Sequence, residues 1–242
     1  MENRGTLTDG EGMIFGLSYK IDIVFCIDVT KGMDNVVEKL PTFLSLVPEF
    51  INQELLKMDR ATNQIRMKVI AFSDSQENAQ IINASEFCTV LPATNSSTLT
   101  AFVNDLRING EGDTPKSALE ALDEAMKSDW VQEEGKSGES LRHVIVLLTD
   151  GSINTVGEYS RELTELEKRW GTDSHDDHAV MHPDRRILIL LAPDIHPWPT
   201  IGDGWAKTVW LPVKVGEGLA EIYDFDFVSE GKAFVSLVRI NA

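Results

Sequence analysis

Several features are scarce in this 242-residue sequence, and each scarcity excludes a class of protein. Two cysteines, Cys26 and Cys88, are too few for a disulfide framework. The longest apolar run, residues 187–192, is far shorter than the ~20 residues that cross a bilayer. The N-terminus lacks the basic segment and apolar core of a signal peptide. We therefore expect a soluble cytoplasmic protein, in which the sequon at Asn95 is incidental.

Basic residues are also scarce. The sequence has 22 Lys and Arg against 39 Asp and Glu, which gives a formal net charge of −17. Such a surface repels phosphate backbones and anionic lipid headgroups, so neither nucleic acid nor membrane is an expected partner. The sequence also has no GxxxxGK[ST] loop, which excludes nucleotide hydrolysis by that route.

Apolar segments of two kinds alternate along the chain. Nearly continuous apolar runs predict fully buried strands at residues 21–27 and 143–149, and further strands are expected at 65–72, 187–191 and 208–213. Shorter strands are expected at 80–82 and 87–91, and residues 225–240 form a strand-like tail. Helical spacing begins at Met33, at Leu99 behind the capping candidates Ser96 and Ser97, at Ala118 and at Tyr159.

This alternation predicts an α/β fold with a doubly wound, mostly parallel central sheet and helices on both faces, a Rossmann-like arrangement. Because the chain has no internal repeat or linker, we expect a single domain over residues 1–242. Its core would span residues 21–213, and residues 214–242 would be a C-terminal extension packed on that core. Pro41 and Pro48 interrupt the first helical stripe, so that helix should be kinked or segmented.

Three loops carry oxygen-bearing side chains toward one edge of this sheet. In open α/β sheets, ligands bind beyond the carboxyl ends of the strands, where the strand order reverses. Asp28 and Thr30 follow the first strand, and Asp150 ends the strand expected beside it. Thr114 begins a helix after the glycine-rich loop 109–113. Two carboxylates and two hydroxyls suit Mg²⁺ or Mn²⁺ better than a soft metal.

These loops resemble the three motifs of von Willebrand factor type A (VWA) domains. The sequence at 28–33, Asp-Val-Thr-Lys-Gly-Met, resembles the family's Asp-x-Ser-x-Ser motif, which often has Thr in the middle and Met after it. Loop 109–115 resembles the second, threonine-bearing loop. Residues 147–151, Leu-Leu-Thr-Asp-Gly, resemble the third motif. Order, spacing and context agree over residues 21–213.

The resemblance implies a metal-ion-dependent adhesion site. In the family, the equivalents of Asp28, Thr30 and Thr114 lie close to the metal, and the equivalent of Asp150 reaches it through water. A carboxylate of a partner protein completes the shell, which implies a non-enzymatic protein-binding module. The sequence is most similar to intracellular members, which in bacteria are often encoded with kinases, phosphatases or stress and tellurium-resistance proteins.

The sequence departs from the family pattern at Gly32, which replaces the second serine of the first motif. A water or the Gly32 backbone would fill that position, and Asp113 is a substitute oxygen donor. If a missing hydroxyl is the only defect, Gly32→Ser should tighten metal binding, which is the outcome we expect. If glycine is needed for a positive φ, serine should instead reduce stability and metal affinity.

Other interpretations of the same residues stay open. Asp28 and Asp150 could be turn formers, and Thr114 could only cap its helix. The chain would then be a metal-free scaffold. A Mg²⁺-dependent aspartate-based phosphatase is less favoured, because haloacid-dehalogenase-like enzymes carry Asp-x-Asp and Thr30 removes the second acid.

Three features lie outside these motifs. His175, Asp176, Asp177, His178, His182 and Asp184 have side chains that ligate zinc, although a solvated polar loop is favoured because no cysteine anchors them. Trp198, Trp205 and Trp210 are either an exposed interaction surface or part of the core. Cys26 is expected to pack rather than to act as a nucleophile.

Overall fold

The computed structural model describes residues 17–73, 82–109, 116–132, 139–151, 160–171 and 180–214. Along these residues the elements are β1 (Leu17–Asp28), α1 (Asp34–Leu56), β2 (Arg60–Phe72), β3 (Ile82–Ala84), β4 (Cys88–Leu91), α2 (Ser96–Asn104), α3 (Lys116–Met126), β5 (Glu139–Leu148), α4 (Ser160–Trp170), β6 (Arg186–Pro193), α5 (Trp198–Gly204) and β7 (Thr208–Val213). The predicted tail at 225–240 and the predicted helix start at Tyr159 lie outside this part of the chain. No helix in it is long and apolar enough to span a membrane.

The strands form one seven-stranded sheet in the order β3-β2-β1-β5-β6-β7, and β4 also pairs with β2. Neighbouring strands from β2 through β1, β5 and β6 to β7 are parallel, whereas β3 and β4 run antiparallel to β2. This arrangement confirms the predicted mostly parallel α/β sheet.

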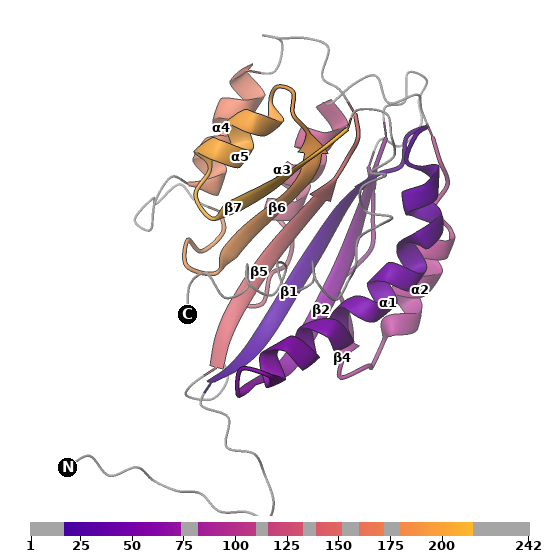
Figure 1. Cartoon of the computed structure of the whole chain (residues 1–242), viewed down its shortest axis with the longest axis vertical. Helices are drawn as coiled ribbons and strands as arrows, with labels where there is room; N and C mark the ends of the chain where they lie inside the picture. The colour runs from indigo at the N-terminus through magenta and orange to yellow at the C-terminus, as the bar shows by residue number, and fades with distance from the viewer. Residues whose placement is uncertain are drawn as a thin grey trace, which may run out of the picture.

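Helices cover both faces of the sheet, which explains why the strands are apolar without alternation. Ile23 and Phe25 of β1 face the core shared with α1 and α2, whereas Val24 and Cys26 face the core shared with α3, α4 and α5. Figure 1 shows α1 and α2 on one side of the sheet and α3 and α4 on the other. Both faces of β1 are therefore buried.

Of the two predicted forms of the first helix, kinked or segmented, the segmented one is wrong, because α1 is one continuous helix with Pro41 and Pro48 inside it. Each proline removes one amide donor from the helix. Burial of the predicted apolar stripe offsets that loss, since its members pack on the sheet: Leu40, Leu44, Val47, Ile51 and Leu55.

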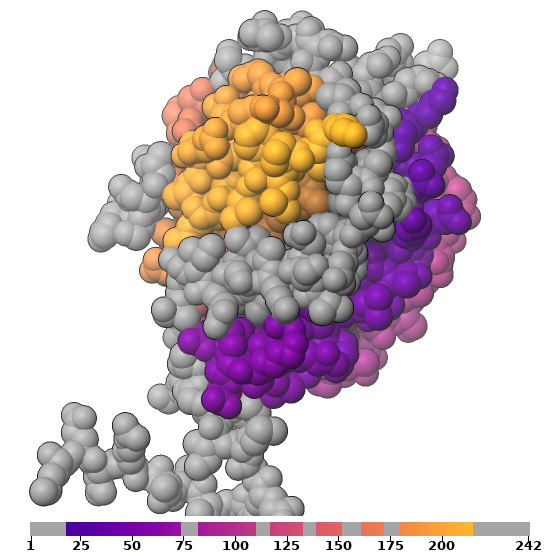
Figure 2. All heavy atoms as spheres, in the orientation of Figure 1, coloured from indigo at the N-terminus to yellow at the C-terminus, as the bar shows by residue number. Residues whose placement is uncertain are grey.

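In Figure 2, α1 (indigo to purple) and the region from α5 to β7 (orange to yellow) lie on opposite flanks of one face.

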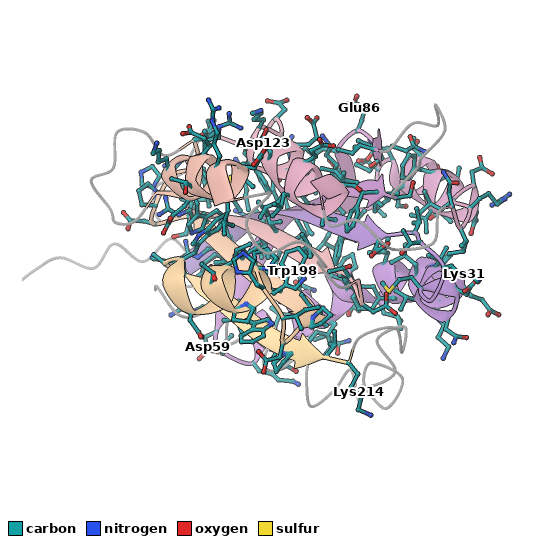
Figure 3. The ribbon with its side chains drawn as sticks, turned by 90° about the horizontal axis from the view of Figure 1, so that it is seen from above. Lys31, Asp59, Glu86, Asp123, Trp198 and Lys214 are labelled. Carbon is teal, nitrogen blue, oxygen red and sulfur yellow. The ribbon has the colours of Figure 1, made fainter. Side chains whose placement is uncertain are left out.

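Two further expectations are decided by the fold. The N-cap of α2 is Asn95 rather than Ser96 or Ser97, and its side chain makes no capping hydrogen bond. Trp198 and Trp205 are buried in the core, with exposed fractions of 1% and 4%, and Trp210 is partly buried against the same cluster. Figure 3 shows Trp198 among the central side chains, whereas Lys31 and Asp59 lie at the periphery.

Candidate functional site

Asp28 lies at the carboxyl end of β1, between the ends of its two neighbouring strands. The chain passes from β1 to β2 on one side and returns to β5 on the other, so the strand order reverses at β1. Ile27 pairs with Leu148, which brings Asp28 beside the residue that follows β5. There the Thr149 hydroxyl donates a hydrogen bond to Oδ2 of Asp28 at 2.6 Å. The predicted adjacency of the two strand ends is confirmed.

The Asp28 carboxylate is held by local donors. Its Oδ1 accepts hydrogen bonds from the backbone N–H of Thr30 at 2.9 Å and from the Thr30 hydroxyl at 2.6 Å. Asp28 and Thr30 are each only 3% exposed. Because the Thr30 hydroxyl directs its proton to Asp28, the lone pairs of Oγ1 remain to accept from a donor or to bind a cation.

Thr149 is a site residue that belongs to the third motif but was not among the predicted metal ligands. Its hydroxyl donates to Asp28 and accepts a hydrogen bond from the backbone N–H of Gly151 at 3.0 Å. Thr149 therefore connects the loops that follow β1 and β5. Its position beside Asp150 was a usable signal, because residues that follow paired parallel strands meet at one sheet edge.

The electrostatics of the site are set by two buried acids. Burial raises the pKa of Asp28, hydrogen bonds from Thr149 and Thr30 oppose that rise, and the negative charge of Asp150 adds to it. Asp150 is also 3% exposed. Within the described part of the chain, Asp28 forms no ion pair. The site thus brings together two buried carboxyl groups whose charged forms disfavour each other.

Gly32 faces Asp150 across the loop that follows β1. Its φ is +110°, and a Cβ at this position would lie 3.0 Å from Oδ2 of Asp150. A positive φ of this size favours glycine. The expectation that only a hydroxyl is missing at position 32 is therefore wrong, because the backbone conformation itself calls for glycine.

The glycine-rich loop begins beside the same strand end. The backbone N–H of Asn109 donates to the carbonyl of Val29 at 2.7 Å. Thr114 and Asp113 lie outside the described residues, so their predicted places in the site stay predictions. The contact at Asn109 shows only that the chain enters that loop next to Asp28.

Of the histidine-rich loop, only His182 and Asp184 are described. The backbone N–H of Asp184 donates to Nδ1 of His182 at 3.2 Å. His175, Asp176, Asp177 and His178 lie outside the described residues. Across the ranges that are described, no three His, Cys, Asp or Glu side chains gather as metal ligands.

Cys26 is placed where a nucleophile would be ineffective. It is fully buried, its Sγ lies 3.6 Å from the carbonyl of Ala121 on α3, and burial raises the pKa of its thiol. A thiol that stays protonated is a poor nucleophile. The placement agrees with the packing role expected from the sequence.

An open parallel sheet with carboxylate and hydroxyl side chains at its switch point defines a class of α/β domains that bind ligands at the carboxyl edge. The family model described as the von Willebrand factor type A domain matches residues 22–175, which is more than half of the chain. The protein therefore belongs to the VWA family. Domains of this family commonly mediate interactions between proteins.

Several solved structures are also similar to this chain. A von Willebrand factor type A protein from Catenulispora acidiphila is 15% identical with a TM-score of 0.49, and the match covers 87% of this chain and 42% of that one. Proximal thread matrix protein 1 from the mussel byssus is 13% identical with a TM-score of 0.45, covering 86% and 47%. The pilus adhesin SpaC from Lactobacillus rhamnosus GG is 12% identical with a TM-score of 0.48, covering 89% and 30%.

The chain thus spans less than half the length of each of these structures. No curated protein matches it.

Proposed function

We propose that this protein is a non-enzymatic, metal-dependent protein-binding module. In this proposal Asp28, Thr30 and Asp150 hold one Mg²⁺ or Mn²⁺, and the ion receives a carboxylate from a partner protein. Thr114 joins the set on the strength of its motif alone. A water is proposed where Gly32 supplies no side-chain oxygen.

The observation that carries the proposal is the pair of buried acids, Asp28 and Asp150, at adjacent strand ends. Burial raises the pKa of Asp28, and repulsion by the nearby Asp150 adds to that rise, so a second negative charge in this poorly solvated place is costly. A divalent cation between them would remove the cost. Carboxylate and hydroxyl oxygens are the ligands that hard cations such as Mg²⁺ prefer.

The partner follows from the charge balance of the site. Mg²⁺ is usually bound through one or two carboxylates and keeps several waters, so a position remains for an oxygen from another protein. Without the cation, an incoming carboxylate would be repelled by Asp28 and Asp150 within a Debye length of about 8 Å. We therefore expect partner binding to depend on the metal. Kinases, phosphatases or stress-response proteins as partners stay a prediction of the resemblance.

The contacts of Thr30 favour binding over phosphatase chemistry. Haloacid-dehalogenase-like phosphatases carry their acid/base two residues after the nucleophile, and at that place Thr30 instead donates its hydroxyl proton to Asp28. We expect no hydrolysis of a generic aryl phosphate in Mg²⁺, measured against an Asp28→Asn variant. A rate that Asp28→Asn abolishes would favour the phosphatase.

Metal binding is tested by calorimetric titration and thermal unfolding with Mg²⁺ and Mn²⁺. An ion at 100 times its Kd should stabilise the protein by about 2.7 kcal/mol, and Asp28→Asn and Asp150→Asn should remove that stabilisation. Asp59→Asn is the matched control. Asp59 is exposed and lies just before the amino end of β2, whereas Asp28 and Asp150 lie at the carboxyl ends of their strands. Asn also tolerates the positive φ of Asp59, which is 56°.

The proposal is rejected if neither ion gives heat or stabilisation at millimolar concentration. The metal-free scaffold would then be the better account.

Partner dependence is tested by a pull-down in Mg²⁺ and in chelator. Asp28→Asn is a better variant here than Asp28→Ala, because Asp28 is buried and accepts hydrogen bonds from two threonines. Alanine would leave both hydroxyls without this acceptor. A partner captured equally well in chelator and by Asp28→Asn would show that the contact lies elsewhere on the molecule.

A further inference from the structure

We propose that Gly32 is a positioning residue, whose missing side chain lets the carboxylate of Asp150 lie against the loop that follows β1. This inference rests on the proposed metal site for its consequence, but its structural part does not need the ion. Gly32 then has a role of its own, beyond the absence of the serine hydroxyl of the family motif.

The backbone conformation of the turn at position 32 favours glycine. The N–H of Met33 donates to the carbonyl of Thr30 at 3.1 Å, which closes a turn over Lys31 and Gly32. Gly32 occupies the third position of this turn with a φ of +110°. Type II turns require a positive φ at that position, and glycine adopts it without steric cost.

The turn over Lys31 and Gly32 is fixed at both ends. Thr30 is tied to Asp28 through both its backbone N–H and its hydroxyl. Met33 is fully buried in the core beneath α1. The turn therefore has little room to move away from β5 when a side chain is added at position 32.

A side chain added at position 32 would contact the carboxylate of Asp150. A Cβ on Gly32 would lie 3.0 Å from Oδ2 of Asp150 and 3.7 Å from its Cγ and Oδ1. Such a contact is tighter than ordinary van der Waals packing, so the buried carboxylate would have to shift. Any side chain at this position, with or without a hydroxyl, would push a proposed ligand of the ion by a few tenths of an ångström.

The experiment compares Gly32→Ser with Gly32→Ala in the wild-type and Asp150→Ala backgrounds. Without metal, we expect both substitutions to lower the Tm of the wild-type protein by about 3–8 °C. The decrease should be smaller in the Asp150→Ala background, because the contact is gone and only the strain at positive φ remains. With Mg²⁺, both substitutions should weaken binding by the same factor, about tenfold.

The comparison of serine with alanine separates a ligand role from a positioning role. If Gly32→Ser binds Mg²⁺ more tightly than the wild type, or more tightly than Gly32→Ala, a hydroxyl at position 32 is a ligand and the proposal is overturned. It is also overturned if the loss of Tm is the same in both backgrounds. If the wild-type protein binds neither ion, the metal site fails, and the metal-free double-mutant cycle still decides whether Gly32 positions Asp150.

Discussion

Strand β1 carries a buried aspartate in each half, and the two are treated differently by the fold. Asp22 is 1% exposed and accepts hydrogen bonds from Nε and a terminal nitrogen of Arg66 at 2.8 and 2.5 Å. Asp28 is 3% exposed, is held by hydroxyl and backbone donors, and lies near a second acid, Asp150. Buried charges in proteins are normally paired or bind a metal. The comparison therefore separates Asp22, which has an arginine partner, from Asp28, which has none among the described residues and is the acid of the proposed metal site.

The surroundings of Asp22 support its structural role. In the sheet register, Asp22 lies opposite Arg66 on β2 and His143 on β5. All three bind the segment that follows α3, because Arg66 donates to the carbonyl of Asp129, Asp22 accepts from the N–H of Val131, and Nε2 of His143 contacts the carbonyl of Val131. Asp22, Arg66 and His143 therefore hold the segment that follows α3 against the sheet.

The largest expected effect is on Asp22. Asp22→Asn should reduce the free energy of unfolding by about 3–4 kcal/mol, because it removes the buried charge that pairs with the half-buried guanidinium of Arg66. Urea denaturation measures the loss, and the stabilisation by Mg²⁺ should persist in the variant. A loss below about 1 kcal/mol would contradict the structural role and weaken the comparison.

A second prediction concerns pH at the same end of the strand. Burial lowers the pKa of His143 to about 4, from 6.5 in an unfolded chain. Between these values the unfolded chain binds a proton that the folded protein does not. The stability present above pH 6.5 is therefore lost as the pH falls toward 4, by about 3 kcal/mol in total. Unfolding measured from pH 7 to 4.5 should show this slope in the wild type and not in His143→Gln; parallel curves would contradict it.

The smallest expected effect is on Asp28 without metal. Asp28→Asn should change the metal-free stability by less than about 1 kcal/mol, because relief of the repulsion from Asp150 offsets the loss of an acceptor for the threonine hydroxyls. Denaturation in chelator measures this change. A loss as large as that of Asp22→Asn would show that Asp28 is as structural as Asp22, and the contrast between the two halves would fail.

The site could be predicted from the sequence in part. The apolar runs and the polar residues that follow them predicted that Asp28 and Asp150 would meet at one edge, because strand ends in a parallel sheet lie together. The hydrogen bond from Thr149 to Asp28 was not predicted, although the place of Thr149 beside Asp150 was a signal for it, and the contact between Gly32 and Asp150 was not predictable. Both depend on distances between loops that are far apart in the sequence.

The same division holds for the fold. Periodicity by itself determined which segments are strands and helices and that β1 and β5 are buried on both faces, because a buried strand needs apolar side chains on each side. Only the tertiary structure decided that α1 continues through Pro41 and Pro48 and that Trp198 and Trp205 lie in the core. The tertiary structure also decided that Asp22, and not Asp28, pairs with an arginine. The arginine lies on the neighbouring strand, and the local sequence does not determine the register between the two strands.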